Sequence, residues 1–287
     1  MIKKIFSIVI PTLNEEKYLP RLLEDLEKQS FPKELFEVVH VDGNSEDKTV
    51  EEATKFNKKI NIKSIVVKKR NVAFQRNTGA DNATGKWIIF MDADNELPDY
   101  FLDGIKYQLA KNKKTDVFSC WINPDGDSPK DVSVAKTANI GMEIYKSLGK
   151  PAVFGALIGV KQNVHKEIGF DEKHKVAEDG YYVVEAIKKG FHYQLFKQPT
   201  YTYSLRRLRK EGSLKMVRIV STLGLKFIQG KDFADTDYGY VMKGGKYYEE
   251  DTSSFFKDTF GFLKKSSKNQ ILQFREILKT INEELGV

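Results

Sequence analysis

Two short acidic motifs in this sequence have residue types and spacing that suit chemistry at a binding site. The first, Asp92-Ala93-Asp94, directly follows the apolar run Trp87–Met91, which is typical of a buried strand. Unpaired charge is costly to bury, and carboxylate oxygens at a strand end are suitable ligands for Mg²⁺ or Mn²⁺, which would in turn suit a diphosphate. Taken alone, the motif fits a polar turn as well or better, because aspartate is a common turn residue.

The second motif, Glu178-Asp179, begins a predicted helix. A carboxylate at a helix N-terminus is stabilised in its ionised form by the helix dipole, which suits a general base. The same residues could simply cap the helix, and from the residues alone capping is the favoured interpretation. The apolar spacing that predicts the helix is that of Tyr182, Val183, Ala186 and Ile187.

The elements that must position these motifs alternate between strands and helices. The predicted strands cover 5–10, 36–41, 62–67, 87–91, 116–121 and 201–203, and the predicted helices cover 15–29, 45–56, 72–83, 98–110 and a segment from 178 onward. We expect Pro11 to end the first strand and Ser45 to cap the second helix. The alternation predicts a doubly wound, mostly parallel α/β sheet, which binds ligands at the carboxyl ends of its strands.

The composition is that of an ordinary globular protein. Of the 287 residues, 40% are apolar and 30% are charged, and Cys120 is the only cysteine, so a reducing, cytoplasmic location is expected. The net charge of +7 is compatible with polyphosphate ligands, anionic membranes or nucleic acid. Because lysines are spread along the chain and no basic-plus-aromatic recognition signature is visible, no nucleic-acid partner is expected.

Common nucleotide-binding motifs are missing, but four other segments share a characteristic order. The segment 11–14 lacks the glycines of a Rossmann fingerprint. The four segments are SIVIPTLNEE (7–16), VVHVDGNSEDKT (38–49), RNVAFQRNTGADNATGKWIIFMDADNELP (70–98) and AEDGYYVVEAIKKGF (177–191). In this arrangement the chain resembles the family 2 nucleotide-sugar glycosyltransferases, which have the Rossmann-like GT-A fold and typically invert the anomeric centre. The resemblance implies a GT-A domain over 1–211, with a nucleotide-sugar half at 1–98 and an acceptor half at 99–211.

The resemblance implies a nucleotide pocket at the ends of the first two strands. Asp42 would accept the imide N–H of a uracil, and Pro11, Thr12 and Glu15 would line the same pocket. Gly43 stands where the family usually has a second aspartate, so this strand supplies one carboxylate fewer than usual. UDP is therefore the expected nucleotide on the basis of Asp42 and the resemblance.

The diphosphate and a metal ion would lie beside the predicted 72–83 helix. Arg76 and Asn77 would face the diphosphate, and Gly79 would allow close backbone approach; Arg76 could otherwise be a solvated helix charge. By the same resemblance, Asp94 would bind the divalent cation, Mn²⁺ or Mg²⁺, directly. Asp92 would contact ribose or sugar hydroxyls as well as the metal shell.

On the acceptor side, the resemblance implies that Asp179 is the catalytic base, with Glu178 as the alternative. Arg206 and Arg207 would belong to a lid over the diphosphate. No histidine follows His192, so the late histidine that some GT-A enzymes use as a metal ligand is missing. Phosphate oxygens and water would then complete the metal shell.

The remaining segment, 212–287, is predicted as an amphipathic, mainly helical C-terminal extension. A basic amphipathic face over 213–230 could rest on the inner face of the cell membrane or pack on the catalytic domain. A last helix over 271–285 carries an apolar stripe that must pack against the domain, a second copy or a bilayer.

The sequence therefore predicts an inverting glycosyltransferase that moves a sugar from a nucleoside diphosphate, most simply UDP, to an acceptor hydroxyl. The acceptor would be a glycan or a lipid-linked precursor in cell-surface polysaccharide or glycolipid synthesis. Two alternatives remain open, namely a polyprenyl-phosphate glycosyltransferase and a non-catalytic binding protein with a degenerate transferase fold. The presence of both Asp92 and Asp94 argues against degeneracy.

Overall fold

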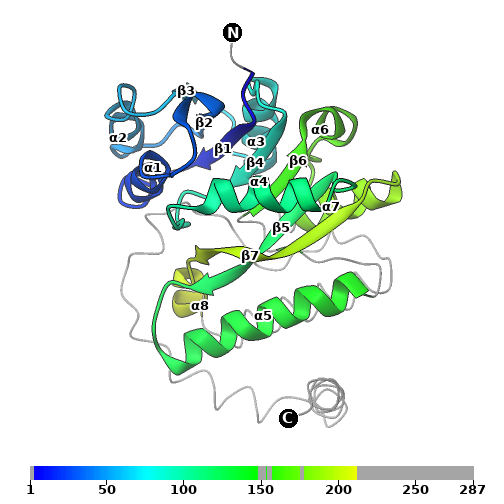
Figure 1. Ribbon diagram of the computed structural model, residues 1–287. Helices are drawn as coiled ribbons and strands as arrows, with labels where there is room; N and C mark the ends of the chain where they lie inside the picture. The colour runs from blue at the N-terminus through cyan, green and yellow to red at the C-terminus, as the bar shows by residue number, and fades with distance from the viewer. Residues whose placement is uncertain (1–2, 148–152, 154–156, 175–177, 212–287) are drawn as a thin grey trace.

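The computed structural model describes residues 3–147, 153, 157–174 and 178–211. They form one seven-stranded sheet with the order β3-β2-β1-β4-β6-β5-β7 (Figure 1). The strands are β1 (Phe6–Thr12), β2 (Phe36–Asp42), β3 (Ile62–Val66), β4 (Trp87–Met91), β5 (Val117–Pro124), β6 (Leu157–Lys161) and β7 (Tyr193–Tyr203). A single sheet thus runs through both predicted halves of the GT-A domain.

Parallel pairing dominates the sheet. The pairs β1–β2, β1–β4, β2–β3 and β5–β7 are parallel, whereas β6 runs antiparallel to both β4 and β5. The expected doubly wound, mostly parallel α/β sheet is confirmed. The antiparallel strand β6 lies between β4 and β5, and so joins the parallel strands β3, β2, β1 and β4 to the parallel pair β5 and β7.

Helices cover both faces of the sheet (Figure 1). One hydrophobic cluster joins the sheet to α1, α2, α4 and α5, and the other joins it to α3, α6 and α7. The helices are α1 (Leu19–Glu27), α2 (Thr49–Thr54), α3 (Val72–Asp81), α4 (Phe101–Lys111), α5 (Pro129–Ser147), α6 (Gln162–Ile168), α7 (Glu178–Lys188) and α8 (Arg206–Glu211). Because β1, β2 and β4 are parallel, their carboxyl ends lie at the same edge of the sheet.

The prediction that Pro11 ends the first strand is wrong. β1 continues to pair with β2 through Pro11–Val41 and Thr12–Asp42. On its other side β1 pairs with β4 only over Phe6–Val9, so beyond Val9 that side is unpaired. A residue without an N–H is tolerated in a strand where its nitrogen points to an unpaired side.

The prediction that Ser45 caps the second helix is also wrong. α2 begins at Thr49, and Lys48 at its N-cap makes no side-chain capping bond. The Ser45 hydroxyl instead donates to Asp42 at 2.6 Å and accepts from the Asn14 backbone N–H at 2.8 Å. Ser45 therefore ties the two loops that follow β1 and β2.

Several elements differ in extent from the sequence prediction. The region from α5 through α6 had no predicted elements, β7 begins at Tyr193 rather than at 201, and α1 begins at Leu19 rather than at 15. The C-terminal extension, 212–287, lies outside the described residues. Within the described part of the chain, none of the helices combines the length and apolar character needed to cross a bilayer.

Candidate active site

The end of β2 holds Asp42 in a fully buried position. Its carboxylate accepts hydrogen bonds from the Thr12 hydroxyl at 2.8 Å, the Ser45 backbone N–H at 2.7 Å and the Ser45 hydroxyl at 2.6 Å. The Thr12 hydroxyl also lies 2.8 Å from Nε2 of His40. Asp42 thus organises the ends of β1 and β2, and its contact with a nucleotide base stays a prediction.

Gln75 is a buried residue of this region that the sequence analysis did not single out. Its side-chain amide donates to the backbone carbonyls of Thr12 at 2.8 Å and Val41 at 2.9 Å, across the ends of β1 and β2. A Cβ added at Gly43 would lie 3.2 Å from the Gln75 Nε2. The glycine that replaces the family's usual aspartate therefore leaves room for Gln75.

Arg76 on α3 connects three elements of the site. Its side chain is 2% exposed, and its guanidinium lies 2.7 Å from Glu178 Oε1 and 3.0 Å from Asp92 Oδ1. The guanidinium carbon also lies 5.3 Å from the centre of the Phe170 ring. Arg76 is therefore not a solvated helix charge but a buried cation that holds the start of α7 beside the end of β4.

Asn77 and Gly79, both predicted to face a diphosphate, make contacts within the protein. The Asn77 amide donates to the Phe170 carbonyl at 2.9 Å and accepts from the Phe170 N–H at 2.8 Å. At Gly79 an added Cβ would lie 2.2 Å from Val9 Cγ1, so the close approach here is between α3 and β1. These contacts place Phe170 beneath Arg76 and seat α3 on the sheet.

Arg206 on α8 brings together Glu15 and Asp94, which are far apart in sequence. Its Nη2 lies 2.9 and 3.1 Å from the two Glu15 carboxylate oxygens, and its Nε lies 3.0 Å from Asp94 Oδ2. The guanidinium carbon is 4.2 Å from the centre of the Tyr18 ring. All three charged residues were predicted from the sequence to belong to one site, whereas no role was predicted for Tyr18.

Bonds at its start fix the position of α8. The Leu205 backbone N–H donates to Asp125 Oδ1 at 3.0 Å, and Ser204 donates its hydroxyl to the same carboxylate at 3.1 Å. Arg209 completes the arrangement, with both of its terminal nitrogens within 3.0 Å of Asp125. Arg206 is therefore presented to the site from an anchored helix.

Burial and mutual repulsion raise the pKa values of the site's carboxylates. Burial raises the pKa of Glu15 to about 8, against the opposing effect of Arg206. It also raises the pKa of Asp94, again opposed by Arg206. For Asp179, burial and then the neighbouring Glu178 raise the pKa to about 7. A group with a pKa near 7 can exchange protons readily at neutral pH.

The site is rich in acidic side chains, because five carboxylates and three guanidiniums lie together in it. The carboxylates are Glu15, Asp92, Asp94, Glu178 and Asp179, and the guanidiniums are Arg76, Arg206 and Arg207. Among the described residues no three His, Cys, Asp or Glu side chains are placed to hold a metal ion by themselves. A divalent cation at Asp94 and Asp92 fits these carboxylate oxygens but would need further oxygen ligands from a phosphate or water.

A mostly parallel sheet with a charged site at the ends of β1, β2 and β4 is the arrangement expected of the GT-A fold. Residues 7–169 match the model for Glycosyl transferase family 2, and because this is more than half of the sequence, the chain belongs to that family. The resemblance predicted from the four segments is confirmed.

Solved structures share the fold. TarS 1–349 from S. aureus in complex with UDP aligns with a TM-score of 0.58 and 23% identity, covering 71% of this chain and 62% of that one. The mannosyltransferase PcManGT from Pyrobaculum calidifontis, in complex with GDP-Man and Mn²⁺, aligns with a TM-score of 0.60 and 20% identity, covering 73% and 61%. At these identities the likeness establishes the GT-A fold.

Relatives found by sequence include named glycosyltransferases. The poly(ribitol-phosphate) beta-N-acetylglucosaminyltransferase TarS of Staphylococcus aureus is 26% identical over 208 residues, which are 70% of this chain and 36% of TarS. A dolichyl N-acetyl-alpha-D-glucosaminyl phosphate 3-beta-D-2,3-diacetamido-2,3-dideoxy-beta-D-glucuronosyltransferase of Methanococcus voltae is 29% identical over 214 residues, 67% of this chain and 64% of that enzyme. The chain thus spans less than two thirds of the length of either relative.

Proposed function

We propose that this protein is an inverting glycosyltransferase that moves a sugar from a UDP-linked donor to an acceptor hydroxyl in cell-surface polysaccharide or glycolipid synthesis. One observation carries the proposal. In a chain of glycosyl transferase family 2, Arg76 and Arg206 gather the acidic residues predicted for metal binding and catalysis at the carboxyl ends of the strands. The S. aureus TarS structures with UDP and with UDP-GlcNAc support the choice of nucleotide.

The donor would bind where β1, β2 and β4 end. Asp94, with Asp92, would hold a Mn²⁺ or Mg²⁺ ion, which would neutralise charge on the departing diphosphate. The Mn²⁺ in the complex of the Pyrobaculum calidifontis enzyme supports a divalent cation. Pro11, Thr12 and the neighbourhood of Asp42 would receive the base.

Asp179 would act as the general base on the acceptor. Its raised pKa, about 7, matches the task of taking a proton from a hydroxyl at neutral pH. As the acceptor oxygen attacks the anomeric carbon in line, the diphosphate leaves and the carboxylate receives the hydroxyl proton. A single displacement inverts the anomeric centre, so no enzyme nucleophile is required.

Calorimetric titration with UDP, GDP, dTDP and CDP, each with and without Mn²⁺, tests the donor site. We expect UDP to bind in a Mn²⁺-dependent manner and Asp94→Asn to weaken this binding by at least about tenfold. Asp99→Asn is a matched control, because Asp99 is an exposed aspartate of the same loop. Failure of every nucleotide to bind would contradict the proposal and favour a non-catalytic protein with a degenerate fold.

Transfer assays with Asp179→Asn separate the two acceptor classes. With a hydroxyl acceptor we expect kcat to fall by about 10²–10⁴-fold, because the base is lost. A polyprenyl phosphate already carries an ionised oxygen, so transfer to it would change little. Glu185→Gln, an exposed carboxylate of the same helix, serves as the control. Unchanged turnover on hydroxyl acceptors would reject Asp179 as the base, and Glu178→Gln would then be tested as the alternative.

A lipid-linked acceptor would require contact with a membrane. The name of the Methanococcus voltae relative, which includes a dolichyl phosphate-linked sugar, supports this kind of acceptor. We propose a cytoplasmic protein that binds the inner membrane face through the basic segment 213–230. Co-sedimentation of the full chain with anionic vesicles is expected and should be lost when Lys215 and Arg218 are replaced by glutamate. Equal binding by that variant would reject this contact.

A further inference from the structure

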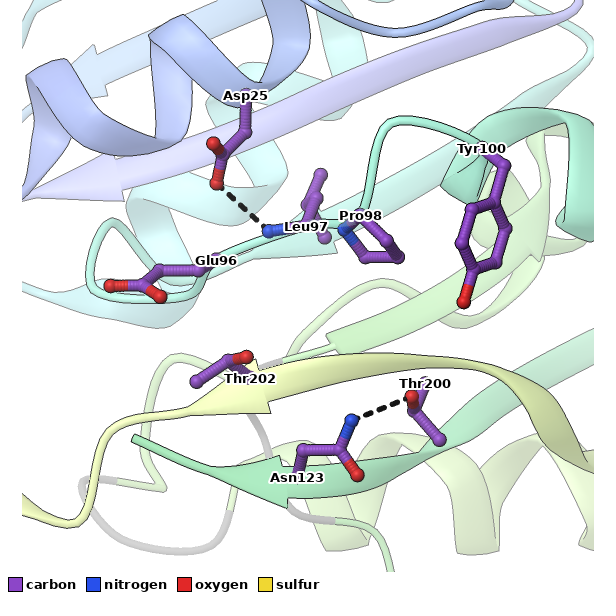
Figure 2. Close-up of a pocket in the computed structure, with 8 residues that line it drawn as sticks. All are labelled: Asp25, Glu96, Leu97, Pro98, Tyr100, Asn123, Thr200 and Thr202. Atoms are coloured by element: carbon purple, nitrogen blue, oxygen red, sulfur yellow. Dashed lines mark hydrogen bonds between the residues drawn. The ribbon is translucent and has the colours of Figure 1, made fainter. Parts of the chain in front are cut away.

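A polar cavity of about 300 Å³ is lined in part by the loop that follows Asp94 (Figure 2). The loop that follows Asp94 forms one wall, the β5 and β7 strands form the opposite wall, and Asp25 of α1, which also lines the cavity, lies next to Leu97 (Figure 2). Its volume is at the lower end of the range for ligand pockets and suits a ligand the size of one sugar ring.

The cavity is lined by one face of β7. Alternation along the strand places Thr200 and Thr202 on the cavity face and Tyr203 on the other. The five carboxylates of the candidate active site are not among the described residues that line the cavity. The cavity is therefore separate from the donor site.

The walls of the cavity are fixed in place by hydrogen bonds. Glu96 and Thr202 exchange two backbone bonds, of 3.1 and 2.9 Å, which tie the loop to β7. Asp25 accepts the Leu97 backbone N–H at 2.9 Å, which ties the same loop to α1 (Figure 2). A cavity whose walls are already held loses little conformational entropy when a ligand binds.

The side chains that line the cavity have unused hydrogen-bonding capacity. Within the described part of the chain, the Glu96 carboxylate, the Tyr100 hydroxyl and the Thr202 hydroxyl make no side-chain hydrogen bond, while Asn123 donates to Thr200 at 2.8 Å. Tyr100 is 54% exposed, so its ring can receive a ligand. Carboxylates, hydroxyls and an amide beside an aromatic ring together match the hydroxyl groups and apolar faces of a sugar.

The charges in the cavity restrict its ligand further. Asp25 and Glu96 contribute two carboxylates, and no lysine or arginine is found among the described lining residues. Anions such as phosphates or uronic acids would be repelled, since like charges at close range are destabilising. Uncharged polyhydroxyl groups are favoured, because carboxylates accept hydrogen bonds from them strongly.

We propose that this cavity binds one uncharged sugar residue of a glycan, as a subsite separate from the donor site. The inference rests on the proposed function only in taking the ligand to be a glycan. Such a subsite would hold a distant part of an acceptor chain and would favour longer acceptors over short ones.

The test is a titration of the ¹⁵N-labelled full chain with cellotetraose, maltotetraose and chitotetraose, followed by amide NMR. At least one of them should shift the amides of Glu96, Tyr100, Asn123 and Thr202. Tyr100→Ala and Asn123→Ala should each weaken this binding by about tenfold or more. Tyr107→Ala is the matched control and should bind like the unaltered protein, since Tyr107 is an exposed tyrosine of α4, the helix that Tyr100 precedes, and lies outside the cavity.

Binding of UDP with Mn²⁺, measured in parallel, keeps the two proposals distinguishable. Unchanged UDP affinity in all three variants would show that they are folded. The subsite is rejected if no tetrasaccharide shifts the cavity amides, or if Tyr100→Ala and Asn123→Ala bind the tetrasaccharide as tightly as the unaltered protein. Cavity binding without any UDP binding would retain the subsite and reject the donor site.

Discussion

The guanidinium of Arg206 lies 3.0 Å from Asp94, the residue predicted to bind the metal directly, while it also contacts Glu15 at 2.9 Å. The arginine thus supplies the positive charge that a divalent cation would supply at the same carboxylate. A cation that binds Asp94 must therefore displace Arg206 or share the carboxylate with it. Arg206 would then be released to meet the diphosphate that arrives with the metal.

Removal of this counter-ion should strengthen binding of the metal alone. Arg206→Gln leaves Glu15 and Asp94 without the guanidinium, so the local potential becomes more negative. We expect the Mn²⁺ affinity measured by electron paramagnetic resonance, without nucleotide, to rise about threefold to tenfold. Arg209→Gln is the control, because Arg209 belongs to the same helix but pairs with Asp125 and Asp131. Equal or weaker Mn²⁺ binding by Arg206→Gln would contradict the competition.

The buried pair of Arg76 and Glu178 should dominate the stability of the site. Arg76→Met would leave the Glu178 carboxylate, 4% exposed, without its cation, which costs about 3–5 kcal/mol of unfolding free energy. The double variant Arg76→Met/Glu178→Gln should recover part of this loss, since no buried charge is left at position 178. Urea denaturation of the two variants measures the difference.

The surface pair of Arg70 and Glu46 provides the control for this measurement. Both side chains are well exposed, at 45% and 74%, and Arg70→Gln should cost less than about 1 kcal/mol. If Arg76→Met were as mild as Arg70→Gln, the buried pair would not hold α7 against β4.

Two glycines in helices should respond to alanine in opposite directions. A Cβ at Gly79 would lie 2.2 Å from Val9 Cγ1, so Gly79→Ala must push α3 away from β1 and should cost about 3 kcal/mol. Among the described residues, no atom outside the backbone of α5 and the adjacent residues lies within 4 Å of a Cβ added at Gly141, so Gly141→Ala should gain about 0.5–1 kcal/mol from helix propensity. Thermal denaturation compares the two, and a stabilising Gly79→Ala would disprove the tight α3–β1 contact.

Local patterns in the sequence were sufficient to predict the strands that carry the site. β2 and β4 are short apolar runs followed by polar residues, and each was predicted to within about one residue. The same patterns predicted that Asp42, Asp92 and Asp94 follow these strands. Nothing in them indicated α5 or β6, because the 121–170 region has neither a clean strand alternation nor a strong helical stripe.

The partners of the site residues could not be predicted, because they are distant in the sequence. Arg76 meets Glu178 across 102 positions, and Asn77 meets Phe170 across 93. Both residues were assigned to a diphosphate from the resemblance, whereas the structure gives them protein partners. Gln75 was missed for the same reason, since only the folded sheet brings the Thr12 and Val41 carbonyls together.

A buried histidine outside the site should make the stability depend on pH. His165 is 5% exposed, shares a 3.0 Å hydrogen bond with the Tyr182 hydroxyl and lies among aromatic rings. Burial lowers its pKa from 6.5 to about 4. As the pH falls, the unfolded state therefore takes up the proton first, so this contribution is complete above pH 6.5 and is lost between about 6.5 and 4.

The expected loss from His165 alone is about 2 kcal/mol of unfolding free energy between pH 7 and pH 5. His165→Phe keeps an aromatic ring in the cluster and cannot be protonated, so urea denaturation at the two pH values should show a smaller difference than in the unaltered protein. The difference should not vanish, because burial also lowers the pKa of His40 to about 4. An unchanged pH difference in His165→Phe would mean that His165 is not kept neutral by the fold.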